Sequence, residues 1–309
     1  MAIAMKKSLA LGILIGIVVI VAVLIYVTSY KLQVTRSPSD TRLQAAATIN
    51  PLADMVSQIG GEYVNVATIL PPGSSPHTFE PAPEQINSAQ NVKLFFAIGH
   101  GLDSWLKPIV DSVPNASTIT VDHNIQLRDL PLDQRDADQP DQTVDPHYWL
   151  TVTNAKVILQ NIADALIQAD PIHKDVYAAN LSSYLAELDQ LDKDIKAQLS
   201  ALSKHELITH HNAWGYFADA YGLKVVGTFE VSPGKEPTPQ QIADLQNKVK
   251  QYSVSTIFSE PQLSDQSLKP FVQDLNLKIA VLDPEGGINN MGYIDLMRYN
   301  ADTIANALK

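Results

Sequence analysis

DPIHKDVYAANLSSYLAELDQLDKDIKAQLSALS, residues 170–203, is the stretch that decides the fold. Asp170 and Pro171 are typical of a helix N-cap and first helical position, and no Gly or Pro follows within the stretch. At 1.5 Å per residue this helix would be about 50 Å long, longer than one small domain, so we predict that it spans two lobes. Its apolar residues recur mostly three or four apart, which predicts one buried stripe: Val176, Leu181, Leu185, Leu188, Leu191, Ile195, Leu199 and Leu202.

On both sides of this helix, short apolar runs alternate with helical patterns, a rhythm typical of α/β folds with a parallel sheet. We therefore predict the α/β class, with two lobes that each hold a mainly parallel sheet flanked by helices, joined by one long rigid helix. The predicted ranges are 43–169 for the N-terminal lobe, 170–204 for the connecting helix and 205–309 for the C-terminal lobe. Strands are expected at 45–49, 63–70, 94–98, 206–209, 223–229, 254–258 and 277–282.

The N-terminal residues 1–30 have the pattern of a membrane anchor or an uncleaved signal. Lys6 and Lys7 precede an uncharged apolar run over 9–27, long enough to cross a hydrocarbon core of about 30 Å. A cleavable signal peptide is the alternative, although its apolar core is usually only about 7–15 residues long. We expect an anchor, followed by a linker over 31–42.

Composition narrows the functional class. The chain has no cysteine, so a lipid attached to a cysteine is excluded for this sequence. Its formal net charge of −11 argues against nucleic acid as a partner and favours attraction of cations. The stretch 129–145 carries six aspartates against one arginine, and its polarity predicts a solvated loop.

Four scattered residues are candidate ligands of a transition metal: His77, His147, His211 and Asp283. Imidazole and carboxylate are ordinary ligands of such ions, and in open α/β sheets ligands bind at the carboxyl ends of strands. His77, His211 and Asp283 follow predicted strands, whereas His147 precedes a predicted helix. Taken singly, each has an ordinary alternative: a surface side chain, a buried hydrogen-bonded imidazole, a helix start and a turn, respectively.

A resemblance to a known family singles out these four residues. The motifs that carry it are PHTFEPAP at 76–83, DPHYWL at 145–150, HNAWGYF at 211–217 and LDP at 282–284. Together they resemble, in order, the motifs of the zinc- and manganese-binding solute-binding proteins of ABC transporters, known as cluster A-I. The resemblance extends over about residues 44–309. It implies that His77, His147, His211 and Asp283 bind one metal ion between two lobes, that an ABC transporter permease is the partner, and that the protein is an extracytoplasmic monomer.

The ligand types favour Zn²⁺ over Mn²⁺. Members of the family that select manganese tend to have Glu where this chain has His211, and imidazole suits zinc better than a hard carboxylate does. Zinc-binding members often carry a His-rich loop ahead of the second ligand, whereas this chain has the aspartate-rich stretch 129–145 there. Zn²⁺ is therefore expected, with Mn²⁺ as the alternative.

Two other functional classes remain as alternatives. A zinc-dependent hydrolase would need an open coordination position, but four protein ligands fill a tetrahedral shell and no His-Glu-x-x-His segment is present. We therefore expect no enzymatic activity. A surface adhesin would also suit an anchored extracytoplasmic protein, and response of a permease to the loaded protein would separate it from a transport protein.

Overall fold

The computed structural model describes residues 42–130, 143–230 and 234–309 of the chain. The predicted anchor at 1–30 and all but the last residue of the predicted linker lie outside the described residues. Within the described part, no helix combines the length and the apolar character needed to cross a membrane. Residues 43–309 form one compact unit.

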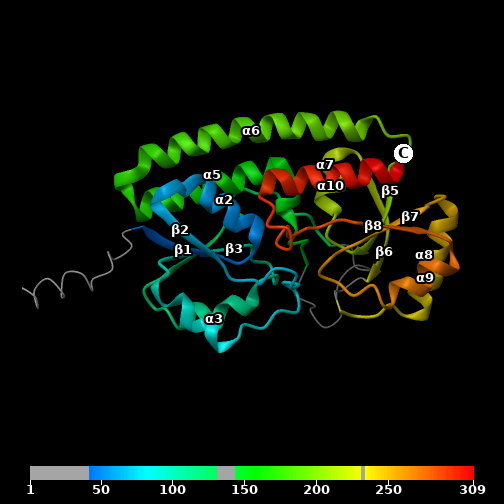
Figure 1. Cartoon of the computed structure of the whole chain (residues 1–309), viewed down its shortest axis with the longest axis horizontal. Coiled ribbons are helices and arrows are strands. Elements are labelled where there is room, and N and C mark those ends of the chain that lie inside the picture. The colour runs from blue at the N-terminus through cyan, green and yellow to red at the C-terminus, as the bar shows by residue number, and fades with distance from the viewer. Residues whose placement is uncertain (1–41, 131–142, 231–233) are drawn as a thin grey trace, which may run out of the picture. The chain divides into compact units, whose positions relative to one another are not determined.

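The N-terminal lobe is built on a four-stranded parallel sheet (Figure 1). The strand order is β2-β1-β3-β4, so the first strand lies in the middle of the sheet. The strands are β1 (Leu43–Ala47), β2 (Val64–Thr68), β3 (Leu94–Ala97) and β4 (Ser117–Thr120), and the α-helices are α2 (Asn50–Gly60), α3 (Pro83–Ser88), α4 (Lys107–Asp111) and α5 (Val152–Ala169). Short 3₁₀ turns occupy Gly61–Tyr63 (η1), Ala89–Asn91 (η2), Ser104–Leu106 (η3) and Tyr148–Leu150 (η5).

The C-terminal lobe repeats this topology, with a parallel sheet in the order β6-β5-β7-β8. Its strands are β5 (Glu206–His211), β6 (Lys224–Glu230), β7 (Thr256–Ser259) and β8 (Lys278–Val281). Its helices are α7 (Gly215–Tyr221), α8 (Pro239–Gln251), α9 (Leu268–Asp274) and α10 (Tyr293–Leu308). The predicted fold class, two α/β lobes with parallel sheets joined by a long helix, is confirmed.

The long helix differs from the prediction in its ends and in part of its buried stripe. A 3₁₀ turn at Pro171–His173 (η6) precedes α6 (Lys174–Ser200), so the α-helix has 27 residues and a length of about 40 Å. Tyr177 and Tyr184 are buried, whereas the neighbouring Val176 and Leu185 are only partly covered. The aromatic rings replace the two aliphatic positions because they continue the spacing of three and four set by the other buried residues: Leu181, Leu188, Leu191, Ile195 and Leu199.

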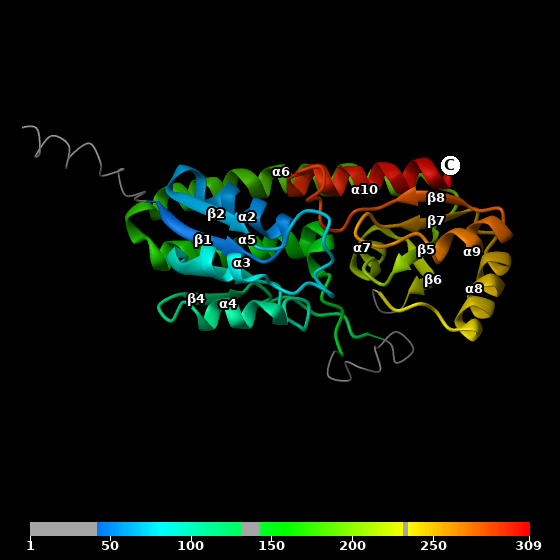
Figure 2. The same ribbon diagram turned by 60° about the horizontal axis from the view of Figure 1, so that its bottom comes forward.

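Two helices span the lobes. Helix α6 packs against α2 and α5 of the N-terminal lobe and against α7 and α10 of the C-terminal lobe. Helix α10 runs alongside α6 in both ribbon views and also packs against α2 (Figures 1 and 2). The connection is therefore broader than the single helix predicted from the sequence.

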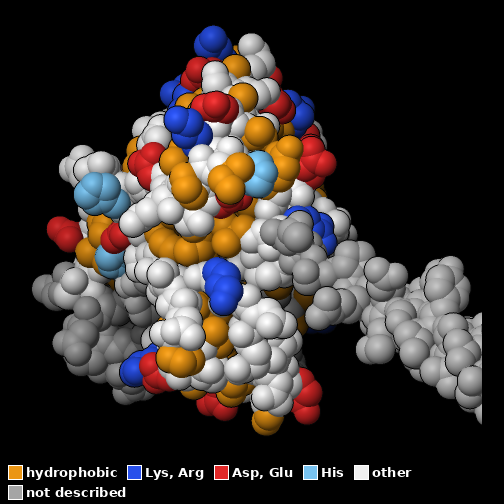
Figure 3. All heavy atoms as spheres, turned by 90° about the vertical axis from the view of Figure 1, so that its left-hand side faces the viewer, with side chains coloured by type: hydrophobic (Ala, Val, Ile, Leu, Met, Phe, Trp, Pro, Cys, Tyr) orange, Lys and Arg blue, Asp and Glu red, His pale blue; other side chains and the backbone are white. Residues whose placement is uncertain are grey.

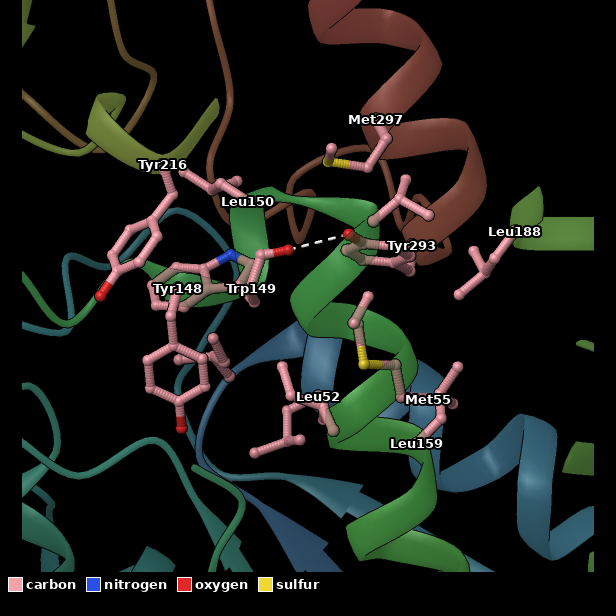
Figure 4. Packing of buried hydrophobic residues seen from close by; sticks show 14 of the residues in the cluster. Leu52, Met55, Tyr148, Trp149, Leu150, Leu159, Leu188, Tyr216, Tyr293 and Met297 are labelled. Atoms are coloured by element: carbon pink, nitrogen blue, oxygen red, sulfur yellow. Dashed lines mark hydrogen bonds between the residues drawn. The ribbon is translucent and has the colours of Figure 1, made fainter. Parts of the chain in front are cut away.

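One hydrophobic core runs through both lobes. It includes Trp149 and Leu159 from the N-terminal lobe and Trp214 and Met297 from the C-terminal lobe, all essentially inaccessible to solvent. Figure 4 shows part of this packing around Trp149 and Tyr293. Two smaller clusters lie on the outer faces of the sheets, beneath α3 and α4 in one lobe and beneath α8 and α9 in the other. A shared core of this kind opposes wide separation of the lobes.

The end of the N-terminal lobe has a mixed surface. Figure 3 views this end, where basic, acidic and apolar side chains are interspersed. No continuous basic patch occupies the described part of this face, unlike the surfaces that neutralise nucleic-acid phosphates.

Candidate metal centre

His77 lies in the loop between β2 and α3, beyond the carboxyl end of β2. The indole of Trp105 donates a hydrogen bond to the carbonyl of Pro76, with an N···O distance of 3.0 Å. The same indole meets the ring of Phe79 edge to face. These contacts on both sides of His77 restrain the loop and direct the imidazole between the lobes.

His147 is oriented by a buried carboxylate. Oδ1 of Asp145 lies 2.8 Å from Nδ1 of His147 and also accepts the backbone N–H of His147 at 3.0 Å. A carboxylate on Nδ1 favours the tautomer whose Nε2 lone pair is free to bind a metal. The hydroxyl of Tyr216, on α7 of the other lobe, donates to the carbonyl of Asp145 at 3.0 Å.

The prediction of a solvated loop is wrong for Asp145, which is fully buried. Burial is tolerated because its carboxylate contacts His147 and lies 3.6 Å from Nη1 of Arg128. The central part of the aspartate-rich stretch, residues 131–142, lies outside the described residues.

His211 is the last residue of β5 and is supported in the same way. Its Nδ1 lies 2.6 Å from Oε2 of Glu260, which directly follows β7. The indole of Trp214 donates to Oε1 of Glu260 at 3.1 Å. Because β5 and β7 are parallel neighbours, the imidazole and its carboxylate meet at the same edge of the sheet.

The three imidazoles converge on one point. Nε2 of His147 lies 3.2 Å from Nε2 of His77 and 3.3 Å from Nε2 of His211. One ligand atom from each of the three residues lies within 4.8 Å of the others. Nitrogen atoms that share one tetrahedral Zn²⁺, with Zn–N bonds of about 2.0–2.1 Å, would be about 3.3 Å apart. The spacing of these rings therefore suits joint coordination of one ion.

The surroundings of His77 favour the neutral form of its imidazole. Burial lowers the pKa of His77 well below its usual value, and the neighbouring imidazoles of His147 and His211 lower it further. A neutral imidazole offers a free lone pair, whereas an imidazolium does not. His77 is therefore in its metal-binding form at neutral pH.

Asp283, the fourth predicted ligand, follows β8 but does not join this group of three within the described residues. Its Oδ1 accepts hydrogen bonds from the side chain of Gln262 at 2.8 Å and from the backbone N–H groups of Glu285 and Gly286 at 2.9 Å. The other oxygen, Oδ2, is buried without a hydrogen-bond partner in the described part of the chain. One carboxylate oxygen is thus fixed, and the other keeps its lone pairs.

Glu285 is a second buried carboxylate at the same place. It lines one cavity with the three histidines, together with Glu260 and Gln262. Only 4% of Glu285 is exposed, and its Oε2 has no hydrogen-bond partner among the described residues. Burial raises the pKa of Glu285 well above its usual value, and the carboxylates of Asp283 and Glu260 add to this rise. A bound cation would reverse this effect by favouring the ionised carboxylate.

The sequence interpretation missed Asp145, Glu260 and Glu285 as parts of the site. Asp145 and Glu285 each lie two positions from a predicted ligand, and this proximity was the available signal. Glu260 stands at the end of a strand, but its pairing with His211 spans 49 positions and depends on strand order.

Other described histidines also lie beside carboxylates. His210 is fully buried, with Nε2 3.3 Å from Oε1 of Glu230 and Nδ1 3.9 Å from Oδ1 of Asp265. Nε2 of His100 lies 2.8 Å from Oδ2 of Asp122. Neither belongs to the convergent group of three.

Comparison with known proteins identifies the family. Residues 46–307 match the family model described as zinc-uptake complex component A, periplasmic. The manganese-binding lipoprotein MntA of Halalkalibacterium halodurans is 30% identical over 273 residues, covering 86% of this chain and 88% of the relative. The high-affinity zinc uptake system protein ZnuA of Bacillus subtilis is 27% identical over 309 residues, covering 95% and 97% of the two chains.

Solved structures agree with this assignment. A crystal structure of ZnuA matches with a TM-score of 0.78 and 28% identity, covering 87% of this chain and all of the other. The laminin-binding protein Lmb of Streptococcus agalactiae, described as bifunctional with adhesin and metal-transporting activity, matches with a TM-score of 0.74 and 25% identity, covering 86% and 100%. The family resemblance and the expected lack of enzymatic activity are thereby confirmed. The chain belongs to the zinc-uptake complex component A family, and it is a metal-binding substrate-binding protein of an ABC transporter.

Proposed function

We propose that the protein captures one divalent transition-metal ion between its lobes and delivers it to an ABC transporter permease. His77 and His147 supply ligands from the N-terminal lobe, and His211 supplies one from the C-terminal lobe. The observation that carries the proposal is the convergence of three Nε2 atoms, with neighbouring pairs 3.2 and 3.3 Å apart. Carboxylates behind His147 and His211 support it, since such partners orient metal-binding imidazoles.

Asp283 is our proposed fourth ligand, acting through Oδ2. This oxygen is buried and has no hydrogen-bond partner within the described residues, while the bonds to Oδ1 fix the position of the carboxylate. Glu285 is the alternative, since its Oε2 is also unpartnered and it lines the cavity with the histidines. Either choice completes a shell of three nitrogens and one oxygen.

The preferred cargo is Zn²⁺. Three imidazoles and one carboxylate suit zinc, whereas Mn²⁺ favours sites richer in oxygen. The relatives are named for both metals, so Mn²⁺ is the alternative cargo. Competitive titration of the purified protein with both ions separates them: we expect Zn²⁺ to displace Mn²⁺ at one site per chain. Preferential retention of Mn²⁺ would reverse the assignment.

A matched variant tests the ligand that sets this preference. His211→Glu replaces an imidazole with a hard carboxylate, so the ratio of Zn²⁺ to Mn²⁺ affinity should fall. His123→Ala, at an exposed histidine, is the control. An unchanged ratio in the His211 variant would show that His211 does not select the metal.

Delivery would take place outside the cytoplasm, with the N-terminal residues 1–30 as the tether. The chain has no cysteine to carry a lipid, and residues 9–27 are an uncharged apolar run. Because both lobes share one core, release would proceed by small lobe rotations and rearrangement of the ligand loops. The protein would act as a monomer. An adhesive role rests only on the likeness to Lmb, and no contact in the described residues favours it.

A further inference from the structure

The segment 283–292, which carries Asp283 and Glu285, connects β8 to α10 and so belongs to the C-terminal lobe by topology. Its backbone, however, is held by the N-terminal lobe. Nδ2 of Asn50, in the first turn of α2, donates to the carbonyl of Glu285 at 3.2 Å and to the carbonyl of Met291 at 2.9 Å. One amide group therefore ties together the two ends of the segment.

Asp54, one helical turn after Asn50, holds the point where the segment enters α10. Its Oδ2 accepts the backbone N–H of Tyr293 at 2.8 Å, the first residue of α10. The N-cap position of α10 is Gly292, which has no side chain to satisfy the free N–H groups of the first turn. The carboxylate of Asp54 does this from the other lobe, at the helix end where negative charge is favourable.

The segment fits closely against the N-terminal lobe because glycines face it. A Cβ added at Gly292 would lie 3.0 Å from Oδ1 of Asp54, and one at Gly287 would lie 3.4 Å from Cα of Pro72. Pro72 belongs to the loop that leads to His77. The segment that carries the carboxylates and the loop that carries an imidazole therefore meet directly across the lobe boundary.

We propose that Asn50 and Asp54 form an interlobe latch that positions the segment 283–292 over the metal and controls how fast the metal leaves. Neither residue lies in the group of three histidines or lines the cavity that they share. With the latch closed, the carboxylates stay beside the imidazoles. Opening it frees the segment to move away from the imidazoles, which exposes the ion to water or to a permease.

The latch and a purely structural contact make different predictions. They differ in whether the rate of metal dissociation changes. Loss of a structural contact lowers the stability of the protein with and without metal. Loss of the latch leaves the imidazoles in place, so metal still binds with one ion per chain, but it dissociates faster. The inference rests on the proposed metal site, and a measurement of the dissociation rate separates the two ideas.

Asn180 provides a matched control. Its Nδ2 donates to the carbonyl of Ile59 at 2.9 Å, so it ties α6 to the far end of α2 with the same kind of bond as Asn50. This bond does not touch the segment 283–292. Asn180→Ala should therefore cost similar stability to Asn50→Ala without changing metal release.

The test is the rate at which Zn²⁺ leaves the full-length protein after mixing with excess chelator. We expect Asn50→Ala and Asp54→Ala each to speed release about tenfold, which corresponds to about 1.4 kcal/mol. Asn180→Ala should stay within about twofold of the unaltered protein. Asp54→Asn keeps an oxygen acceptor for the backbone N–H of Tyr293, so it should speed Zn²⁺ release by an intermediate factor. This variant also keeps the test possible if Asp54→Ala does not fold.

The outcomes distinguish the latch from the site. If the unaltered protein binds Zn²⁺ and the Asn50 and Asp54 variants release it at the unaltered rate, the latch is wrong and the metal site stands. If Asn180→Ala speeds release equally, the effect is general destabilisation and the latch is also wrong. If the unaltered protein binds no Zn²⁺, the proposed function itself fails.

Discussion

The two halves of the proposed metal centre are preorganised to different degrees. The three imidazoles already converge, with neighbouring Nε2 atoms 3.2 and 3.3 Å apart. The carboxylates of Asp283 and Glu285 lie nearby, yet neither joins that group within the described residues. His211 ends a central strand, and buried carboxylates orient the rings of His147 and His211. Asp283 and Glu285 instead stand on the segment between β8 and α10. In the proposed mechanism, this preformed set of nitrogens would capture the ion, and the separate segment would complete its shell.

The largest effect should come from removing an imidazole. His147→Ala deletes the ring that contacts both others, and we expect Zn²⁺ affinity to fall by more than about 100-fold, beyond the loss typical of an outer-shell change. Calorimetric titration measures this, with His123→Ala as the control. Unaltered affinity in the His147 variant would exclude His147 as a ligand. It would also contradict the view that the three imidazoles are the preorganised half of the site.

A smaller loss is expected from the carboxylates behind the imidazoles. Asp145→Asn and Glu260→Gln preserve shape but remove the charge that faces Nδ1 of His147 and His211. Affinity should drop about 10–100-fold, and the measurement is the same titration. If both variants bind Zn²⁺ as the unaltered protein does, the imidazoles do not need these carboxylates for their orientation.

Substitutions in the segment 283–292 should lower Zn²⁺ affinity by a smaller factor, and they test which carboxylate is the fourth ligand. Asp283→Asn should weaken Zn²⁺ binding by about tenfold, because Oδ2 loses its charge while an amide oxygen can still contact the ion. Glu285→Gln should weaken binding less. Parallel titration of the two variants is the measurement. The opposite order would assign the fourth ligand to Glu285, and equal unaltered affinities would leave the shell with three protein ligands.

The smallest effect is the pH dependence of the metal-free protein. The pKa of His77 is lower in the folded state than in the unfolded chain, where it is about 6.5. Between these two values the unfolded chain binds more protons, so stability rises with pH across this window and falls on acidification. Chemical denaturation of the unaltered protein and of His77→Gln should therefore diverge in pH dependence below about pH 6.5. Parallel curves would contradict the desolvation of His77.

The sequence predicted the two parallel sheets because central strands such as β3 (LFFA) are apolar runs. It did not reveal β4 (STIT), an edge strand with a mostly exposed pattern, or the short helix α3. Local residue patterns carry little signal for elements of this kind, since their pairing and packing partners are distant in sequence.

The candidate site was likewise predictable only where local sequence patterns carry the information. The histidines were found because each stands beside an apolar run in a family motif. The sequence did not predict where the carboxylates of Asp283 and Glu285 lie relative to the imidazoles, because their position depends on contacts across the lobes. The bond from the indole of Trp149 to the carbonyl of Pro284, at 3.0 Å, joins residues 135 positions apart. No local pattern encodes such a contact.

The most direct test of the central claim is a crystal structure of the Zn²⁺-loaded protein with anomalous scattering measured at the zinc edge. We predict one zinc peak per chain, about 2.0–2.1 Å from the Nε2 atoms of His77, His147 and His211, and in contact with a carboxylate oxygen of the segment 283–292. A peak bound by residues of one lobe alone, or one remote from these imidazoles, would contradict joint capture by both lobes.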